Sequence, residues 1–177
     1  MQDIDRLFRE FHAPIVRYLT RQLNDADLAE ELAQETFVRA LRYGRAENKP
    51  VTNERAWLFA VATNLIRDTV RRDTRQRKHL MALAAELGET EPEAVEPTPE
   101  ELRQAATAQQ ALQTIPERDR AALFMSQEGL NYQEIAAALG LSVQSVGTTL
   151  TRARKKVVQR YEDLSRLRDG GGAHVAS

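Results

Sequence analysis

The sequence contains no cysteine and only three histidines, His12, His79 and His174, which lie far apart along the chain. The absence of thiols excludes disulfide bonds and thiol catalysis. A zinc site needs a cluster of thiolate or imidazole ligands, and the sequence has none. We therefore expect neither a metal nor another cofactor.

Long hydrophobic runs are also missing. The longest, "AWLFAVA", is far too short to span a bilayer. The first residues, "MQDIDRLFRE", are charged and do not resemble a signal peptide. The expectation is a chain that does not insert into a membrane and works in the cytoplasm.

No segment shows the sustained alternation of apolar and polar residues that is typical of a strand, and runs of β-branched residues are absent. The pattern predicts an all-α fold. In the first half we expect helices at about 3–22, at about 25–41 and from 54 to beyond 72. Asn53 precedes the third of these and is suited to cap it.

A block rich in proline and glutamate, from Gly88 to Glu101, separates the two halves. It lacks the apolar residues needed to bury itself and should be extended and flexible. Composition alone supports no more than a passive tether. The predicted organisation is a domain at 1–78, an acidic linker at 79–104, a four-helix domain at 105–167 and a disordered tail at 168–177.

The second half contains a helix-turn-helix candidate. Asn131 and Glu134 have the spacing of a capping box before one short helix, and Ser142 can cap the next. Gly140 falls where the turn needs a positive φ, and Ala136 is small where the helices would cross. The shared core would consist of Ile135, Leu139, Leu141, Val146 and Leu150. A tight helical hairpin in a protein that does not bind DNA could share much of this pattern.

The stretch "LGLSVQSVGTTLTRARKKV", residues 139–157, has two distinct faces as a helix. One is apolar and consists of Val143, Val146, Leu150, Ala153 and Val157. The other is polar and then cationic, and consists of Gln144, Ser145, Thr148, Arg152, Lys155 and Lys156. This order suits a helix that reads base edges with its first turns and binds phosphates with the rest. The alternative is an ordinary solvated surface.

Charge is segregated along the chain although the net charge is only −1. Residues 22–38 hold five acids and no base, whereas 67–78 hold six bases and two acids. Residues 86–101 hold seven glutamates and no base, and 152–160 hold five bases and no acid. Such blocks indicate several distinct partner surfaces.

The helix from residue 54 has a broad apolar arc, and the face predicted to lie opposite consists of Ala60, Thr63, Asn64, Arg67 and Arg71. A basic cluster continues along it through Arg71, Arg72, Arg75, Arg77 and Lys78. Such a face can bind nucleic acid, because each phosphate contact adds to affinity. Trp57, at the edge of the arc, could stack on an unpaired base. Packing in the core is the alternative for Trp57.

Three segments in this order carry a family resemblance: "DLAEELAQETFVRALR" (27–42), "AWLFAVATNLIRDTVRR" (56–72) and "IPERDRAALFMSQEGLNYQEIAAALGLSVQSVGTTLTRAR" (115–154). Over about residues 8–158 the chain resembles bacterial sigma factors of the extracytoplasmic-function (ECF) group, in the sigma-70 family. The resemblance implies a non-enzymatic transcription initiation factor. It would bind core RNA polymerase and direct it to promoters by recognising the minus-ten and minus-thirty-five elements.

The resemblance also implies a role for particular residues. The first domain would bind the polymerase clamp helices through Asp27, Glu30, Glu31, Gln34, Glu35 and Phe37. It would recognise the minus-ten element and its melted non-template strand through Trp57, Thr63, Asn64, Arg67, Arg71, Arg72 and Arg75. The second domain would bind the polymerase flap and read the duplex minus-thirty-five element through Gln144, Ser145, Thr148, Thr149, Arg152, Lys155 and Lys156. An anti-sigma factor is a further expected partner.

The resemblance gives the acidic linker a place in the channel later used by nascent RNA. Neutralising Glu89, Glu91, Glu93 and Glu96 should then alter initiation. The chain departs from the family pattern at Ala60, and at Gly147 and Thr149, where the family carries basic or polar side chains.

Two rival functions remain open from the residues alone. One is a free-standing helix-turn-helix regulator that dimerises on a palindrome without polymerase. The other is a nuclease that uses the acids of the second helix, Asp27, Glu30, Glu31 and Glu35, to bind a metal. Without carboxylates on another motif, those acids are better interpreted as a docking face.

Overall fold

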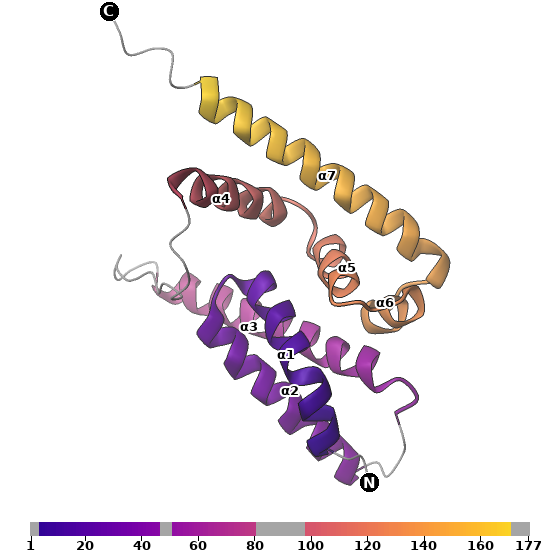
Figure 1. Ribbon diagram of the computed structural model, residues 1–177. Coiled ribbons are helices and arrows are strands. Elements are labelled where there is room, and N and C mark those ends of the chain that lie inside the picture. The colour runs from indigo at the N-terminus through magenta and orange to yellow at the C-terminus, as the bar shows by residue number, and fades with distance from the viewer. Residues whose placement is uncertain (1–3, 47–50, 81–97, 171–177) are drawn as a thin grey trace, which may run out of the picture.

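The computed structural model describes residues 4–46, 51–80 and 98–170, and within these ranges it contains helices and no strand (Figure 1). The predicted all-α fold is confirmed. The helices are α1 (Ile4–Leu23), α2 (Ala26–Ala46), α3 (Glu54–Leu80), α4 (Pro99–Gln113), α5 (Glu117–Gln127), α6 (Tyr132–Leu139) and α7 (Val143–Gly170).

Helices α1, α2 and α3 form the first helical domain, in which each helix contacts the other two. Their boundaries follow from local chemistry. Asn24 takes a positive φ of 54° after α1, a conformation that asparagine tolerates better than most residues. Asp25 then accepts a hydrogen bond from the Leu28 N–H at 2.9 Å, and Asn53 accepts one from the Ala56 N–H at 2.9 Å. The predicted Asn53 cap is therefore present.

A buried chain of hydrogen bonds crosses the core of the first domain. The Thr63 hydroxyl donates to the Phe59 carbonyl at 2.7 Å, and the Tyr18 hydroxyl lies 2.8 Å from the Thr63 oxygen. Burial raises the pKa of the Tyr18 hydroxyl to about 12, so the phenol stays protonated and donates. The prediction that Thr63 lies on the open face of its helix is wrong, because α1 packs against α3 and Tyr18 covers Thr63.

Replacing Tyr18 by phenylalanine should lower the free energy of unfolding by about 1 kcal/mol. The ring would keep its edge-to-face packing on Phe59, and only the hydroxyl would be removed. Urea unfolding followed by circular dichroism would measure the change. Tyr132→Phe is the matched control, because Tyr132 is 50% exposed. Equal losses of stability in the two variants would contradict the role given to the Tyr18 hydroxyl.

Helices α4 to α7 form the second domain, and its turns match the predicted helix-turn-helix. Asn131 and Glu134 make a reciprocal capping box at the start of α6. Gly140 ends α6 with a φ of 64°, a conformation that favours glycine. The Leu141 N–H then donates to the Ala136 carbonyl at 2.9 Å, which closes the turn into α7.

The second domain extends beyond the predicted boundaries at both ends. Helix α4 begins at Pro99, within the segment predicted as linker, because Thr98 and Glu101 form a capping box and proline is tolerated in the first turn. Helix α7 continues to Gly170, three residues into the predicted tail. Residues 81–97, which include the linker glutamates, and residues 171–177 lie outside the described part of the chain.

The two domains pack directly against each other. Helix α6 lies on α3, and α5 lies on α1 (Figure 1). The buried apolar residues of both domains form one connected cluster. This packing differs from the prediction of two domains joined by a flexible linker, because composition carries no information on contacts between distant helices.

Candidate nucleic-acid interface

The first turns of α7 present polar side chains to solvent. Gln144 and Thr148 are exposed, and Lys155 and Lys156 follow on the same face. Ser145 is half-buried, and its hydroxyl donates to the Ser142 carbonyl at 2.8 Å. The Ser145 N–H donates to the Ser142 hydroxyl at 3.3 Å, as the predicted Ser142 cap requires. The exposed face of α7 therefore has the chemistry of a base-reading helix followed by a phosphate-binding one.

Two residues of α7 differ from their predicted exposure: one predicted to face DNA is buried, and one predicted to face the core is exposed. Thr149 is buried, with 6% of its surface exposed, and is wrong as a DNA-facing residue. Helices α5 and α6 both pack on α7, so the buried face of α7 is broader than the narrow apolar stripe predicted from its sequence. Val143, predicted on the apolar face, is 47% exposed because it is the first residue of α7 and overhangs the core.

Arg152 is held by a carboxylate from α5. Its Nε lies 3.1 Å from Asp119 Oδ2 and its Nη2 lies 2.8 Å from Asp119 Oδ1. The Asp119 hydrogen bond and negative charge raise the pKa of the Arg152 guanidinium. Asp119 is 3% exposed, whereas the Arg152 side chain is about half exposed. Asp119 thus fixes the orientation of Arg152 on the surface. The sequence analysis did not predict this partner, because the two residues lie on different helices, α5 and α7.

A shallow hollow of about 630 Å³ lies between the start of α5 and the middle of α7. Four cations line it: Arg152, Lys155, Lys156 and Arg160. Asp163 is the acid among the lining residues. Concave surfaces with this excess of positive charge suit the phosphate backbone of a nucleic acid.

Helix α3 carries the second polar and cationic face. Asn64 is exposed, and Arg67 Nη1 donates to its Oδ1 at 3.4 Å. Arg67 also pairs with Glu117 of the second domain, with its Nε 2.8 Å from Glu117 Oε1. Arg71 is exposed one turn further on. The side chains of Arg72 and Arg75, later on α3, lie outside the described part of the structure.

Trp57 is half-buried at the edge of the first domain. Its ring lies 5.1 Å from the Tyr43 ring and packs against the apolar core. Core packing, the alternative predicted for Trp57, therefore holds for part of its side chain, and the rest stays exposed. A base could reach the remaining exposed edge.

Of the acids on the predicted polymerase-binding face of α2, some form ion pairs and others form none with the residues that the structure describes. Asp27, Glu31 and Gln34 are exposed. Glu30 pairs with His12 at 3.1 Å, and Glu35 pairs with Arg39 at 2.9 Å. These positions leave a largely acidic surface for a partner.

Phe37 is 5% exposed and does not lie on that surface as predicted. Its ring packs edge-on against Phe8 at 5.0 Å, because α1 covers this side of α2. Phe8 is 43% exposed and supplies the aromatic surface that sequence reasoning assigned to Phe37. Phe8 lies beside the buried Leu7 and Phe11 on the helical wheel of α1. The sequence pattern alone therefore does not distinguish it from a core residue.

Gly147 lies in the exposed first turns of α7. An added methyl group would come within 3.4 Å of the Tyr132 ring, which is ordinary van der Waals distance. Gly147→Ala should therefore raise the free energy of unfolding by about 0.5–1 kcal/mol. Thermal unfolding would measure the increase. Unchanged or lower stability would show that Tyr132 cannot accommodate the methyl group. A concurrent fall in promoter affinity would show that DNA approaches the backbone at this position.

Within the described ranges, no group of three or more histidine, aspartate or glutamate side chains could hold a metal ion. None of the helices in those ranges is both long and apolar enough to cross a membrane.

The chain matches two family models, "Sigma-70 region 2" over residues 7–76 and "Sigma-70, region 4" over residues 106–157. It is 31% identical to the RNA polymerase sigma factor YlaC of Bacillus subtilis, over 93% of this chain and 96% of the relative. It is 33% identical to the ECF RNA polymerase sigma factor SigE of Mycolicibacterium smegmatis, over 89% of this chain and 61% of the relative.

A solved structure shares the fold. It is the sigma factor RpoE of Bartonella quintana in complex with the anti-sigma factor NepR, with a TM-score of 0.70 and 18% identity. The likeness covers 92% of this chain and 98% of that one. The two matched regions and the curated relatives place this chain in the sigma-70 family, as a transcription initiation factor of the ECF group that directs RNA polymerase to promoters.

Proposed function

We propose that the chain docks on core RNA polymerase through the exposed face of α1 and α2, and contacts promoter DNA through α3 and α7. The residues offered to the polymerase are Phe8, Asp27, Glu31 and Gln34. Those offered to the minus-ten element are Asn64, Arg67 and Arg71, with Arg72 and Arg75 following on the same helix. Those offered to the minus-thirty-five element are Gln144, Ser145, Thr148, Arg152, Lys155 and Lys156.

The observation that carries this proposal is that acidic and cationic side chains lie on different surfaces of the molecule. Two exposed residues in the first half of α2, Asp27 and Glu31, are acidic, whereas the residues of α3 and α7 named above are polar or cationic. DNA binding depends on releasing counterions from phosphates, so the cationic faces suit DNA and the acidic one does not. A polypeptide partner is the better occupant for α2 and Phe8, because the face combines acids with an exposed ring.

The division of labour follows from helix chemistry. On α7 the short polar side chains come first and can reach base edges in a major groove, while the lysines of the next turns can bind phosphates. On α3 an amide and several guanidinium groups can hold an unpaired strand, whose bases are open to hydrogen bonding. No step in this scheme requires catalysis by the chain. We also propose an anti-sigma protein as a partner, since the structurally similar RpoE was solved with one.

The test is a pull-down with purified bacterial core polymerase followed by run-off transcription on genomic promoter fragments. The expected result is stable binding and new, discrete start sites. Asp27→Asn/Glu31→Gln should weaken the pull-down, whereas Glu162→Gln/Asp163→Asn, the same charge change near the end of α7, should not. Tight binding to duplex DNA without any binding to core polymerase would instead support a free-standing regulator.

A further inference from the structure

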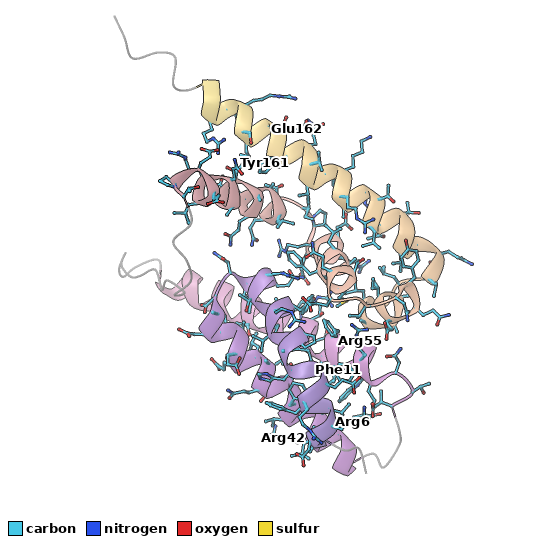
Figure 2. All side chains as sticks on the ribbon, viewed as in Figure 1. Arg6, Phe11, Arg42, Arg55, Tyr161 and Glu162 are labelled. Atoms are coloured by element: carbon cyan, nitrogen blue, oxygen red, sulfur yellow. The ribbon has the colours of Figure 1, made fainter. Side chains whose placement is uncertain are left out.

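Three arginines of the first domain converge on the end of α5. Arg17 Nη2 lies 2.8 Å from Glu128 Oε2, and Arg21 Nη1 lies 2.9 Å from Glu128 Oε1. Arg55 donates to the Gly129 carbonyl at 3.2 Å and to the Glu128 carbonyl. Figure 2 labels Arg55 near the start of α3, which packs against α6. The Glu128 side chain is only 3% exposed between these groups.

This interaction satisfies the chemistry of a helix end. The carbonyls of Phe124, Met125 and Ser126 in the last turn of α5 accept backbone N–H groups of residues 128–130. The Arg55 guanidinium donates to the next carbonyls, those of Glu128 and Gly129, at the negative end of the helix dipole. Arg17 and Arg21 neutralise the Glu128 carboxylate that closing removes from water. The attraction in such a buried cluster is largely offset by desolvation. The net stabilisation from these ion pairs is therefore modest.

Closure also engages one cation of the proposed minus-ten face. Arg67, which we place on promoter DNA, pairs with Glu117 at the start of α5, and its Nη1 contacts Asn64. A phosphate cannot take the position of the Glu117 carboxylate while the domains are packed together. The acids at both ends of α5 thus lie against cations of the first domain.

The closed chain is also too short to contact both promoter elements at once. Elements near minus ten and minus thirty-five are separated by about 25 base pairs, or roughly 85 Å at 3.4 Å each. A compact chain of 177 residues has a radius of gyration of about 16 Å and is therefore roughly 40 Å across. The domains must separate before both elements can be contacted at once.

We propose that Glu128, held by Arg17, Arg21 and Arg55, is an intramolecular latch that keeps the free chain closed and its minus-ten face blocked. The inference rests on the proposed function for its DNA consequence, but closure itself does not. Separation of the domains frees Arg67 for DNA. A partner that binds the open form shifts the equilibrium by its preference for that form.

The test is fluorescence energy transfer within the full-length free chain. The sequence has no cysteine, so Arg42→Cys and Leu167→Cys place two labels, one on each domain. Arg42 is exposed and Leu167 is 74% exposed. Anisotropy of a short fluorescent single strand, taken from the non-template strand of a promoter mapped by run-off, reports binding at the minus-ten face.

Glu128→Arg places a third cation beside Arg17 and Arg21. Energy transfer should fall, and the single strand should bind at least about tenfold more tightly, because apparent affinity scales with the fraction of open chain. Arg17→Glu/Arg21→Glu should open the chain from the other side of the latch. The triple variant Arg17→Glu/Arg21→Glu/Glu128→Arg should restore both energy transfer and weak binding. Circular dichroism would verify that each variant is folded.

Glu162→Arg is the matched control, since it makes the same charge change on the part of α7 that lies away from the first domain (Figure 2). It should leave both readouts unchanged. The latch is overturned if Glu128→Arg and Arg17→Glu/Arg21→Glu retain the energy transfer of the natural chain. Opening without tighter binding would overturn its inhibitory role. The energy-transfer measurement needs neither polymerase nor promoter, so its failure is distinct from failure of the proposed function.

Discussion

Replacing Leu150 by alanine should remove a large part of the stability of the second domain. Leu150 is 1% exposed and lies in the core shared by α7 and the helix-turn-helix, with Ile135 and Val146. Deleting a buried leucine side chain to alanine typically costs about 2–5 kcal/mol, through reduced apolar burial and the cavity left behind. Whole domains are stable by only about 5–15 kcal/mol. The base-reading face of α7 should therefore lose its fixed position.

Urea unfolding followed by circular dichroism would measure the loss of stability, and run-off transcription would measure its consequence. Promoters that depend on the minus-thirty-five element should lose activity, while binding of α1 and α2 to core polymerase should persist. Leu167→Ala is the control, because that side chain is 74% exposed and should change stability by less than about 0.5 kcal/mol. A loss below about 1 kcal/mol for Leu150→Ala would show that α7 is not anchored as described.

Replacing Lys155 and Lys156 together by glutamine should weaken promoter binding by the holoenzyme uniformly across sequences. Both lysines line the cationic hollow beside α5 and are placed on backbone phosphates. Removing one cation from a phosphate should lower the magnitude of the slope of log K against log salt by about 0.9, so the double variant should change it by about 1.8. At moderate salt the affinity should fall by roughly tenfold or more.

The measurement is filter binding or anisotropy on a promoter duplex over a range of salt concentrations. Arg103→Gln/Arg166→Gln removes the same charge from exposed side chains, 60% and 73% accessible, that pair within their own helices. The control should leave the slope unchanged. An equal change in both double variants would mean that only overall charge matters and that α7 does not bind phosphates at defined positions.

Local features of the fold were predictable because each depends on neighbours in sequence. The caps at Asn53 and Ser142, the capping box of Asn131 with Glu134 and the left-handed turn at Gly140 all form within a few residues. The helical period also placed Asn64 and Lys155 correctly at the surface.

Other features depended on packing between distant segments. Thr63 is buried because Tyr18 of another helix covers it, and Phe37 is buried because Phe8 does. Thr149 lies at the edge of a stripe whose width is set by how α5 and α6 pack. A helical wheel treats each helix alone and cannot show how far its neighbours extend over it.

The ion pairs between different helices were beyond sequence reasoning for the same reason. Glu128 meets Arg17 across 111 positions, and Arg152 meets Asp119 across 33. Single charges in amphipathic helices give no indication of such partners. The acidic linker favoured two separate domains, whereas the structure packs them together through a shared apolar cluster and through charges on α1, α3 and α5.

The central claim is that this chain brings polymerase to a promoter through two DNA-binding faces on two domains. Hydroxyl-radical footprinting of a mapped promoter, with chain and core polymerase added separately and together, tests it most directly. Protection at both the minus-ten and minus-thirty-five elements only when the two are combined is the predicted result. Lys155→Gln/Lys156→Gln should remove the upstream protection first. Protection of a palindrome by the chain alone, unchanged by core polymerase, would contradict the claim.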